Sequence, residues 1–120
     1  MVGFRNKYYM KSLAVRELVI REYARLFQSY DLVLTPTMPF PAPRFSQIQE
    51  MKPLEMYQAD YLTVPPNLAG MPHISLPCGY HYDLPVGMQL VASHWNEGAL
   101  LSAADQWESI FPYRFPEVCQ

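Results

Sequence analysis

The positions of its prolines limit what this chain can fold into more than any other feature. Twelve of the 120 residues are proline, about twice the usual share of about 5%. A proline fixes its own φ angle, lacks an amide donor and pushes the preceding residue toward extended geometry, so it ends or interrupts helices and central strands. The segments between the prolines are rich in leucine, valine, isoleucine and aromatic residues. The sequence therefore predicts a folded chain of short elements joined by many loops.

Hydrophobic spacing predicts three helices. The first covers residues 8–29, where apolar side chains recur every three to four positions at Leu13, Ile20, Ala24 and Phe27. Pro53 can open a second, shorter helix that stops before residues 64–66. The third begins at Asn96 as N-cap and ends before Pro112. Its predicted buried face consists of Leu100, Ala104, Trp107 and Phe111.

Three further segments have strand character. Residues 31–35 form a continuously apolar run, which predicts a strand buried on both faces. Residues 73–78 and 86–92 predict a hairpin whose loop, residues 79–85, is longer than the tightest turns.

The connections between these elements complete an α/β layout. Residues 35–43 predict an extended loop, and Asn67 is expected to cap a single helical turn that Gly70 ends. Three strands with three helices leave sheet edges that the chain does not cover. We therefore interpret residues 1–120 as a single partial domain of a larger sheet.

Composition and charge disfavour several classes of function. Nine basic and eleven acidic residues give a formal charge of −2, so no basic surface for nucleic acid or for an anionic membrane is expected. Cys78 and Cys119 lack CxxC spacing, which favours reduced thiols over a disulfide framework. The N-terminal residues lack the apolar core of a signal peptide, and no apolar run is long enough to cross a membrane. We expect a cytoplasmic protein.

No side chain stands out as a nucleophile or a metal ligand. His73, His81 and His94 lack the i, i+4 pairing of a helical zinc site. Ser75 lies outside any GxSxG elbow and is more typical of a strand residue facing a polar neighbour. Cys78 is interpreted as a small filler at a strand end, because no cationic neighbour that would favour its thiolate can be named. We therefore predict no catalytic residue, metal site or cofactor in this chain.

Asp60 is the acidic residue of most interest. It lies between Tyr57 and Tyr61 and just before a proline-rich segment, so its carboxylate is expected in a partly enclosed place that favours a cationic partner. A solvated acid on a short helix is the commoner situation. The ammonium group of a ligand is the alternative partner.

Four blocks, in this order, resemble the C-terminal part of the amidase signature family. They are DLVLTPT at residues 31–37, MYQADYLTVPPNLAGMPHISLPCG at 56–79, LPVGMQ at 84–89 and EGALL at 97–101. Within the family, the second block is most similar to the A subunits of glutamyl-tRNA(Gln)/aspartyl-tRNA(Asn) amidotransferases, the GatA type. Together the blocks cover nearly the whole chain.

The resemblance implies a fold and an activity. The fold is the C-terminal portion of a mixed β-sheet core flanked by helices. Family members are amidohydrolases with a Ser, cis-Ser, Lys triad. GatA-type subunits hydrolyse glutamine and pass the ammonia to a GatB-type partner, which amidates misacylated Glu-tRNA(Gln) or Asp-tRNA(Asn), with a small GatC-type subunit in the complex. ATP and Mg²⁺ are expected only at the partner subunit, and the resemblance assigns Asp60 to the α-ammonium group of the substrate glutamine.

The chain also departs from the family pattern. Its lysines, Lys7, Lys11 and Lys52, do not lie in a glycine- and serine-rich signature segment, so this chain alone is predicted to be inactive and to need the N-terminal part of the amidase. His73 replaces a small residue, and residues 93–96 replace a Gly-x-x-Phe-Asp pattern. Two alternatives stay open: a fragment of an amidase acting on other amides, and a catalytically dead binding or assembly module that self-associates through uncovered sheet edges.

Overall fold

The computed structural model describes residues 2–113, with side chains described from residue 7 onward. The elements follow in the order α1 (Val2–Leu26), β1 (Leu32–Pro36), α2 (Phe45–Glu50), α3 (Pro53–Ala59), α4 (Val64–Ala69), β2 (His73–His81), β3 (Leu84–Ala92) and α5 (Glu97–Ile110). The α/β class and the three strands are confirmed. Residues 2–113 contain five helices where the sequence predicts three, because the short helices α2 and α4 lack a repeated hydrophobic pattern.

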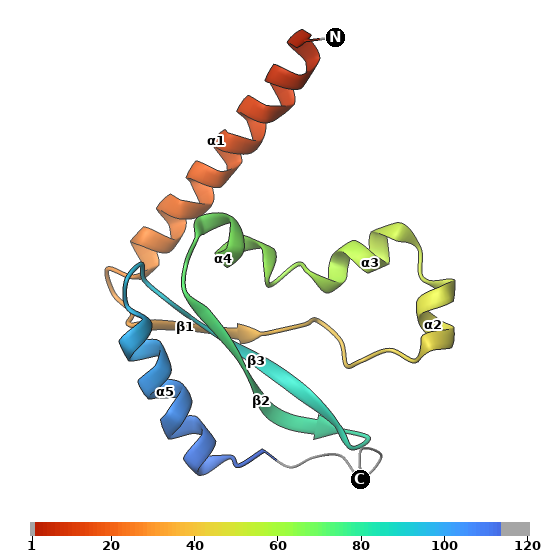
Figure 1. Ribbon diagram of the computed structural model, residues 1–120, viewed down its shortest axis with the longest axis vertical. Helices are drawn as coiled ribbons and strands as arrows, with labels where there is room; N and C mark the ends of the chain where they lie inside the picture. The colour runs from red at the N-terminus through yellow and green to blue at the C-terminus, as the bar shows by residue number, and fades with distance from the viewer. Residues whose placement is uncertain (1, 114–120) are drawn as a thin grey trace.

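The three strands form one antiparallel sheet with β3 in the centre, between β1 and β2. Leu34 of β1 and Ile74 of β2 both pair with Leu90 of β3. In Figure 1 the sheet occupies the middle of the molecule, α5 runs along one side of it, and the N-terminal half of α1 projects away from it. The helices α2, α3 and α4 form an arc that connects β1 to β2.

Alternation along β3 divides the core between the two faces of the sheet, because successive side chains of a strand point to opposite faces. Met88, Leu90 and Ala92 belong to one cluster, which includes Leu100 and Ala104 of α5. Val91 belongs to a second cluster. It contains Ala69 and Met71, and the side chains packed against it include Val19, Ile20, Tyr23 and Phe27. One face of the sheet is therefore covered by α5 and the other by α1 and α4.

The predicted face of α5 is confirmed. Leu100 and Ala104 are buried against the sheet. The indole N–H of Trp107 donates a 2.8 Å hydrogen bond to the carbonyl oxygen of Pro77. Asn96 is the N-cap residue, and Phe111 follows the last helical turn.

The prediction of a long hairpin loop is wrong. Strand β2 continues to His81 and β3 begins at Leu84, so only Tyr82 and Asp83 form the turn. Both have positive φ angles, 48° and 61°, as a type I′ turn requires. Asn-Gly or Asp-Gly is the usual signal for this turn, and without it the sequence pattern indicates a longer loop.

The prediction for Asn67 is also wrong. Helix α4 begins at Val64 with Thr63 as N-cap, and Asn67 lies inside it, donating its side-chain N–H to the Thr63 carbonyl at 2.9 Å. Prolines are tolerated in a first helical turn because their missing N–H would have no partner there. Residues 64–66 therefore open a helix. Gly70 ends it with φ 72°, as predicted.

Strand β1 is not buried on both faces, contrary to prediction. It lies at an edge of the sheet, and the side chain of Leu34 is 62% exposed. Helix α1 also differs from residues 8–29, because it begins at Val2 and ends at Leu26. Leu13, expected on the packed face, is 38% exposed.

Several large apolar side chains of α1, of α3 and of the turn after α3 are exposed. They include Tyr8, Leu18, Leu54, Tyr57 and Tyr61. The Cα radius of gyration is 17.6 Å, whereas a compact domain of this length has about 14 Å. Exposed apolar surface on this scale is typical of surfaces that contact other polypeptide. No helix in the described part of the chain is long and apolar enough to span a membrane.

Candidate functional site

Asp60 lies at the C-terminal end of α3, where it is the C-cap residue with φ −92° and ψ 5°. Helix α3 starts at Pro53, and the backbone N–H of Lys52 donates to the Glu55 carboxylate at 2.8 Å. The Asp60 side chain is exposed. Among residues 7–113, whose side chains the structure describes, no hydrogen bond or ion pair involves its carboxylate. The carboxylate is therefore available to a ligand, but the described residues do not enclose it.

The backbone of the turn after Asp60 is held by hydrogen bonds. The Asp60 carbonyl accepts from the N–H groups of Thr63 and Val64, at 3.1 and 2.9 Å, and from the Thr63 hydroxyl at 3.2 Å. Such bonds hold the backbone conformation of residues 60–63 and so set the direction of the Cα–Cβ bond of Asp60.

A pocket of about 420 Å³ lies beside this turn. Gln58, Tyr61 and Leu62 line it from the α3 side, and Pro39 and Phe40 from the loop after β1. The proline-rich loop thus contributes a wall next to the segment that carries Asp60. Asp60 is not itself among the residues that line this pocket, so the pocket lies near the turn without containing the carboxylate.

Gln89 is a polar core residue that the sequence analysis does not identify. It lies in the central strand β3 and is 2% exposed. Its side-chain N–H group donates to the Leu62 carbonyl at 3.1 Å and to the Thr35 hydroxyl at 3.3 Å. A polar residue within the apolar run 86–92 is the signal that the sequence offers, because a buried amide needs hydrogen-bond partners.

Ser75 faces a polar neighbour, as expected. Its hydroxyl lies 2.7 Å from the hydroxyl of Thr37, and Gly87 lies directly beside the pair. A Cβ atom at Gly87 would be only 2.8 Å from the Thr37 oxygen. Glycine at this position therefore allows the two hydroxyl groups to meet above β3.

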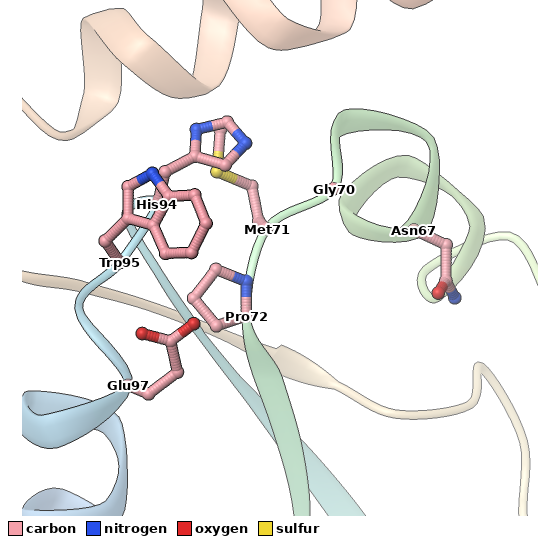
Figure 2. A pocket seen from close by; sticks show the side chains of 7 residues that line it. All are labelled: Asn67, Gly70, Met71, Pro72, His94, Trp95 and Glu97. Carbon is pink, nitrogen blue, oxygen red and sulfur yellow. The ribbon is translucent and has the colours of Figure 1, made fainter.

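A second pocket, of about 280 Å³, lies between α4 and the start of α5. Figure 2 shows His94 and Trp95 beside Met71 and Pro72, with the Glu97 carboxylate directed toward Pro72. The His94 ring lies 3.1 Å from the Ala69 carbonyl through Nε2. Trp95 is 92% exposed and has φ 64°. Residues 93–96, which depart from the family pattern, thus form part of the wall of this second pocket. Asp60 does not line it.

The histidine and cysteine residues considered as candidates are involved in local packing and hydrogen bonding. The His73 ring is 2.9 Å from the Met71 carbonyl through Nδ1, which agrees with a local packing role. His81 contacts the Tyr82 ring. Cys78 is a free thiol that packs against the α5 side of the core, whereas Cys119 lies outside the described residues. In the described part of the chain, no three His, Cys, Asp or Glu side chains are grouped so as to hold a metal ion.

The sequence of this chain is similar to those of known amidases. The Amidase family model matches residues 2–101. The A subunit of the glutamyl-tRNA(Gln) amidotransferase of Methanococcoides burtonii is 46% identical over 106 residues, which are 88% of this chain and 22% of that protein. The chain therefore spans less than a quarter of that relative's length.

Solved structures give the same picture. The crystal structure of the glutamyl-tRNA(Gln) amidotransferase A subunit from Thermotoga maritima matches with a TM-score of 0.87 and 34% identity, over 98% of this chain and 27% of that one. The structure of 6-aminohexanoate cyclic dimer hydrolase matches with a TM-score of 0.68 and 29% identity, over 84% of this chain and 25% of that one.

Proposed function

This chain belongs to the amidase family, and from that premise we propose that it is the C-terminal part of a GatA-type amidotransferase A subunit. The complete subunit hydrolyses glutamine to glutamate and ammonia. The ammonia is used to amidate misacylated Glu-tRNA(Gln) or Asp-tRNA(Asn). The likeness in sequence and fold to A subunits supports this proposal.

Asp60 is the contribution of this chain to substrate binding. Its exposed carboxylate has no hydrogen-bond or ion-pair partner among residues 7–113, and its backbone is held by the hydrogen bonds of the following turn. This is the observation that carries the proposal, because an unpaired carboxylate on a backbone that is held in place suits the α-ammonium group of glutamine. Charge-assisted hydrogen bonds of this kind are about twice as strong as neutral ones.

The bond-breaking groups lie in the N-terminal part of the amidase. There a serine, activated by a cis-serine and a lysine, attacks the amide carbonyl of glutamine and ammonia leaves. The exposed apolar side chains of α1 and α3 support contact with that part of the domain. GatB-type and small GatC-type subunits complete the cytoplasmic enzyme, and ATP and Mg²⁺ act at the GatB-type subunit.

Two substrates that differ only in the ammonium group test the role of Asp60. Glutamine and 4-carbamoylbutanoate share the amide and the carboxylate, but the second lacks the α-amino group. We compare kcat/KM for the two amides in the complete A subunit with its partner subunits, for the natural protein and for Asp60→Asn. The ratio of the two values, glutamine over 4-carbamoylbutanoate, is called the ammonium preference below.

Asp60→Asn is expected to lower the ammonium preference roughly tenfold to a hundredfold, the range set by one hydrogen bond between charged groups. Asp105→Asn, which removes an exposed carboxylate of α5, is the matched control and should leave it unchanged. Hydrolysis of simple amides without hydrolysis of glutamine would instead support an amidase of another specificity. Absence of any amide hydrolysis, together with self-association of the chain, would support the binding module.

A further inference from the structure

Gln89 connects the turn that carries Asp60 to the centre of the sheet. Its carboxamide is almost completely buried, and Nε2 donates to the carbonyl oxygen of Leu62, two residues after Asp60. The same nitrogen also lies within hydrogen-bond distance of the Thr35 hydroxyl in β1. One side chain of β3 therefore binds both the neighbouring strand and the turn.

The turn's own hydrogen bonds do not determine where it lies relative to the sheet. The Asp60 carbonyl is bound by groups of Thr63 and Val64, and the Thr63 carbonyl by the side chain of Asn67. All these partners belong to residues 60–67, that is, to the turn and to helix α4, which packs on the sheet through Ala69. The bond from Gln89 to Leu62 differs because its donor belongs to the sheet itself, in the central strand β3.

Strand β3 holds this donor in a well-defined position. It is paired on both sides, with Gln89 opposite Thr35 of β1 and Ser75 of β2. Its neighbours Met88 and Leu90 are buried in the core. A donor on a central, buried strand has little freedom to follow a shift of the turn.

We propose that Gln89 is a positioning residue, which holds the 60–63 turn so that the Asp60 carboxylate meets the ammonium group of the substrate. The inference rests on the proposed function of Asp60. Gln89 does not touch the substrate; it acts through Leu62 and the backbone of the turn. Misplacement of a binding group by about 1 Å can lower the rate of an enzyme by as much as a hundredfold, so loss of this bond is expected to weaken glutamine recognition specifically.

Gln89→Met tests the inference in the complete A subunit with its partner subunits. Methionine keeps the length and approximate volume of glutamine but cannot donate to Leu62. The expected result is a fall of about tenfold in the ammonium preference, as for loss of about one hydrogen bond. The kcat value for 4-carbamoylbutanoate should stay within about twofold of the natural protein, because the bond-breaking groups are untouched.

Gln106→Met is the matched control. Gln106 lies on the exposed side of α5 and donates to Ser102 within the same helix. The same chemical change there should leave the ammonium preference unaltered.

Gln89→Glu provides a second test that does not depend on the stability of Gln89→Met. A neutral carboxyl group can donate its O–H to the Leu62 carbonyl, whereas an ionised one cannot and would repel that oxygen. Burial raises the pKa of a carboxyl group, so protonation is expected within the accessible pH range. The ammonium preference of this variant should rise as the pH falls from about 8 to about 6, beyond any change in the natural protein.

The outcomes separate this inference from the proposed function. If Asp60→Asn lowers the ammonium preference and Gln89→Met does not, the positioning role is wrong and the proposed function stands. An equal loss of kcat/KM for both amides in Gln89→Met would indicate a general structural role and overturn the inference. If Gln89→Met fails to fold, a pH-independent preference in Gln89→Glu overturns it. If Asp60→Asn has no effect, the proposed function and the inference both fail.

Discussion

Trp107 of α5 donates its indole N–H to the carbonyl oxygen of Pro77, which lies 30 positions earlier in the chain, at a distance of 2.8 Å. Pro77 belongs to the edge strand β2, next to the irregularity in its pairing with β3 between Pro77 and Gly79. The indole thereby satisfies a strand carbonyl at a position where the ladder is disturbed. Helix α5 is thus tied to the sheet by a directional bond as well as by apolar packing.

Trp107→Phe is expected to destabilise the protein by about 1–3 kcal/mol, because the Pro77 carbonyl loses its donor in a partly buried place. The stacking on Phe111, at 5.7 Å between ring centroids, can persist with the smaller ring. The free energy of unfolding by urea is the quantity to measure. The control, Trp95→Phe, changes a side chain that is 92% exposed, so an equal effect of the two changes would contradict the importance of the bond.

Gly87→Ala is expected to destabilise the sheet by about 1–3 kcal/mol, as overpacking of a tight site does. The new methyl group would lie 2.8 Å from the Thr37 hydroxyl and 3.1 Å from that of Ser75, so their 2.7 Å contact must open. Gly79→Ala is the matched control in the neighbouring strand, because a Cβ atom there meets nothing within 4 Å. Thermal unfolding of both variants decides the point. Similar midpoints would refute the steric argument.

Tyr23 is expected to make the free energy of unfolding depend on pH in the alkaline range. Burial raises the pKa of its phenol above the ordinary value of 10.0, because the charged form is poorly solvated where the ring packs on Phe27. The unfolded chain therefore loses this proton at lower pH than the folded protein does. The associated stability is complete below the unfolded pKa and is lost as the pH rises through the folded pKa.

Tyr23→Phe should accordingly reduce the loss of stability between about pH 9 and about pH 11. Urea titrations at a series of pH values measure the difference from the natural protein. Tyr30→Phe, at a tyrosine that is 62% exposed, serves as the control and should behave like the natural protein. A steeper alkaline loss in Tyr23→Phe would contradict the assigned direction of the shift.

The elements that the sequence predicts best are those whose pattern is repeated and local. The face of α5 follows from Leu100 and Ala104 at helical spacing, and both are buried. Gly70 is predictable as a helix end because few other residues adopt its positive φ. The Tyr82–Asp83 turn is not predictable in this way, because Tyr82 is not typical of positive φ and no glycine marks the pair. The exposure of Leu34 depends on how far α5, which packs against β2 and β3, extends over that face of the sheet, and no local pattern reports this.

In the candidate site too, local features can be predicted from the sequence and long-range contacts cannot. Asp60 can be identified because it lies in a distinctive block of residues, yet its free and exposed carboxylate cannot be inferred from that block. Gln89 escapes sequence analysis because its partners, Leu62 and Thr35, are 27 and 54 positions away in the chain. Contacts over such distances come from the antiparallel pairing of β1 with β3 and from the return of the chain through α3 and α4.

The most direct test of the central claim is the ammonium preference of Asp60→Asn in the complete A subunit with its partners. We predict that the preference for glutamine over 4-carbamoylbutanoate falls roughly tenfold to a hundredfold. The free energy of unfolding should stay the same, because the carboxylate has no hydrogen bond or ion pair with the side chains or backbone that the structure describes. An unchanged preference in a well-folded Asp60→Asn protein would contradict the assignment of Asp60 to the substrate's ammonium group.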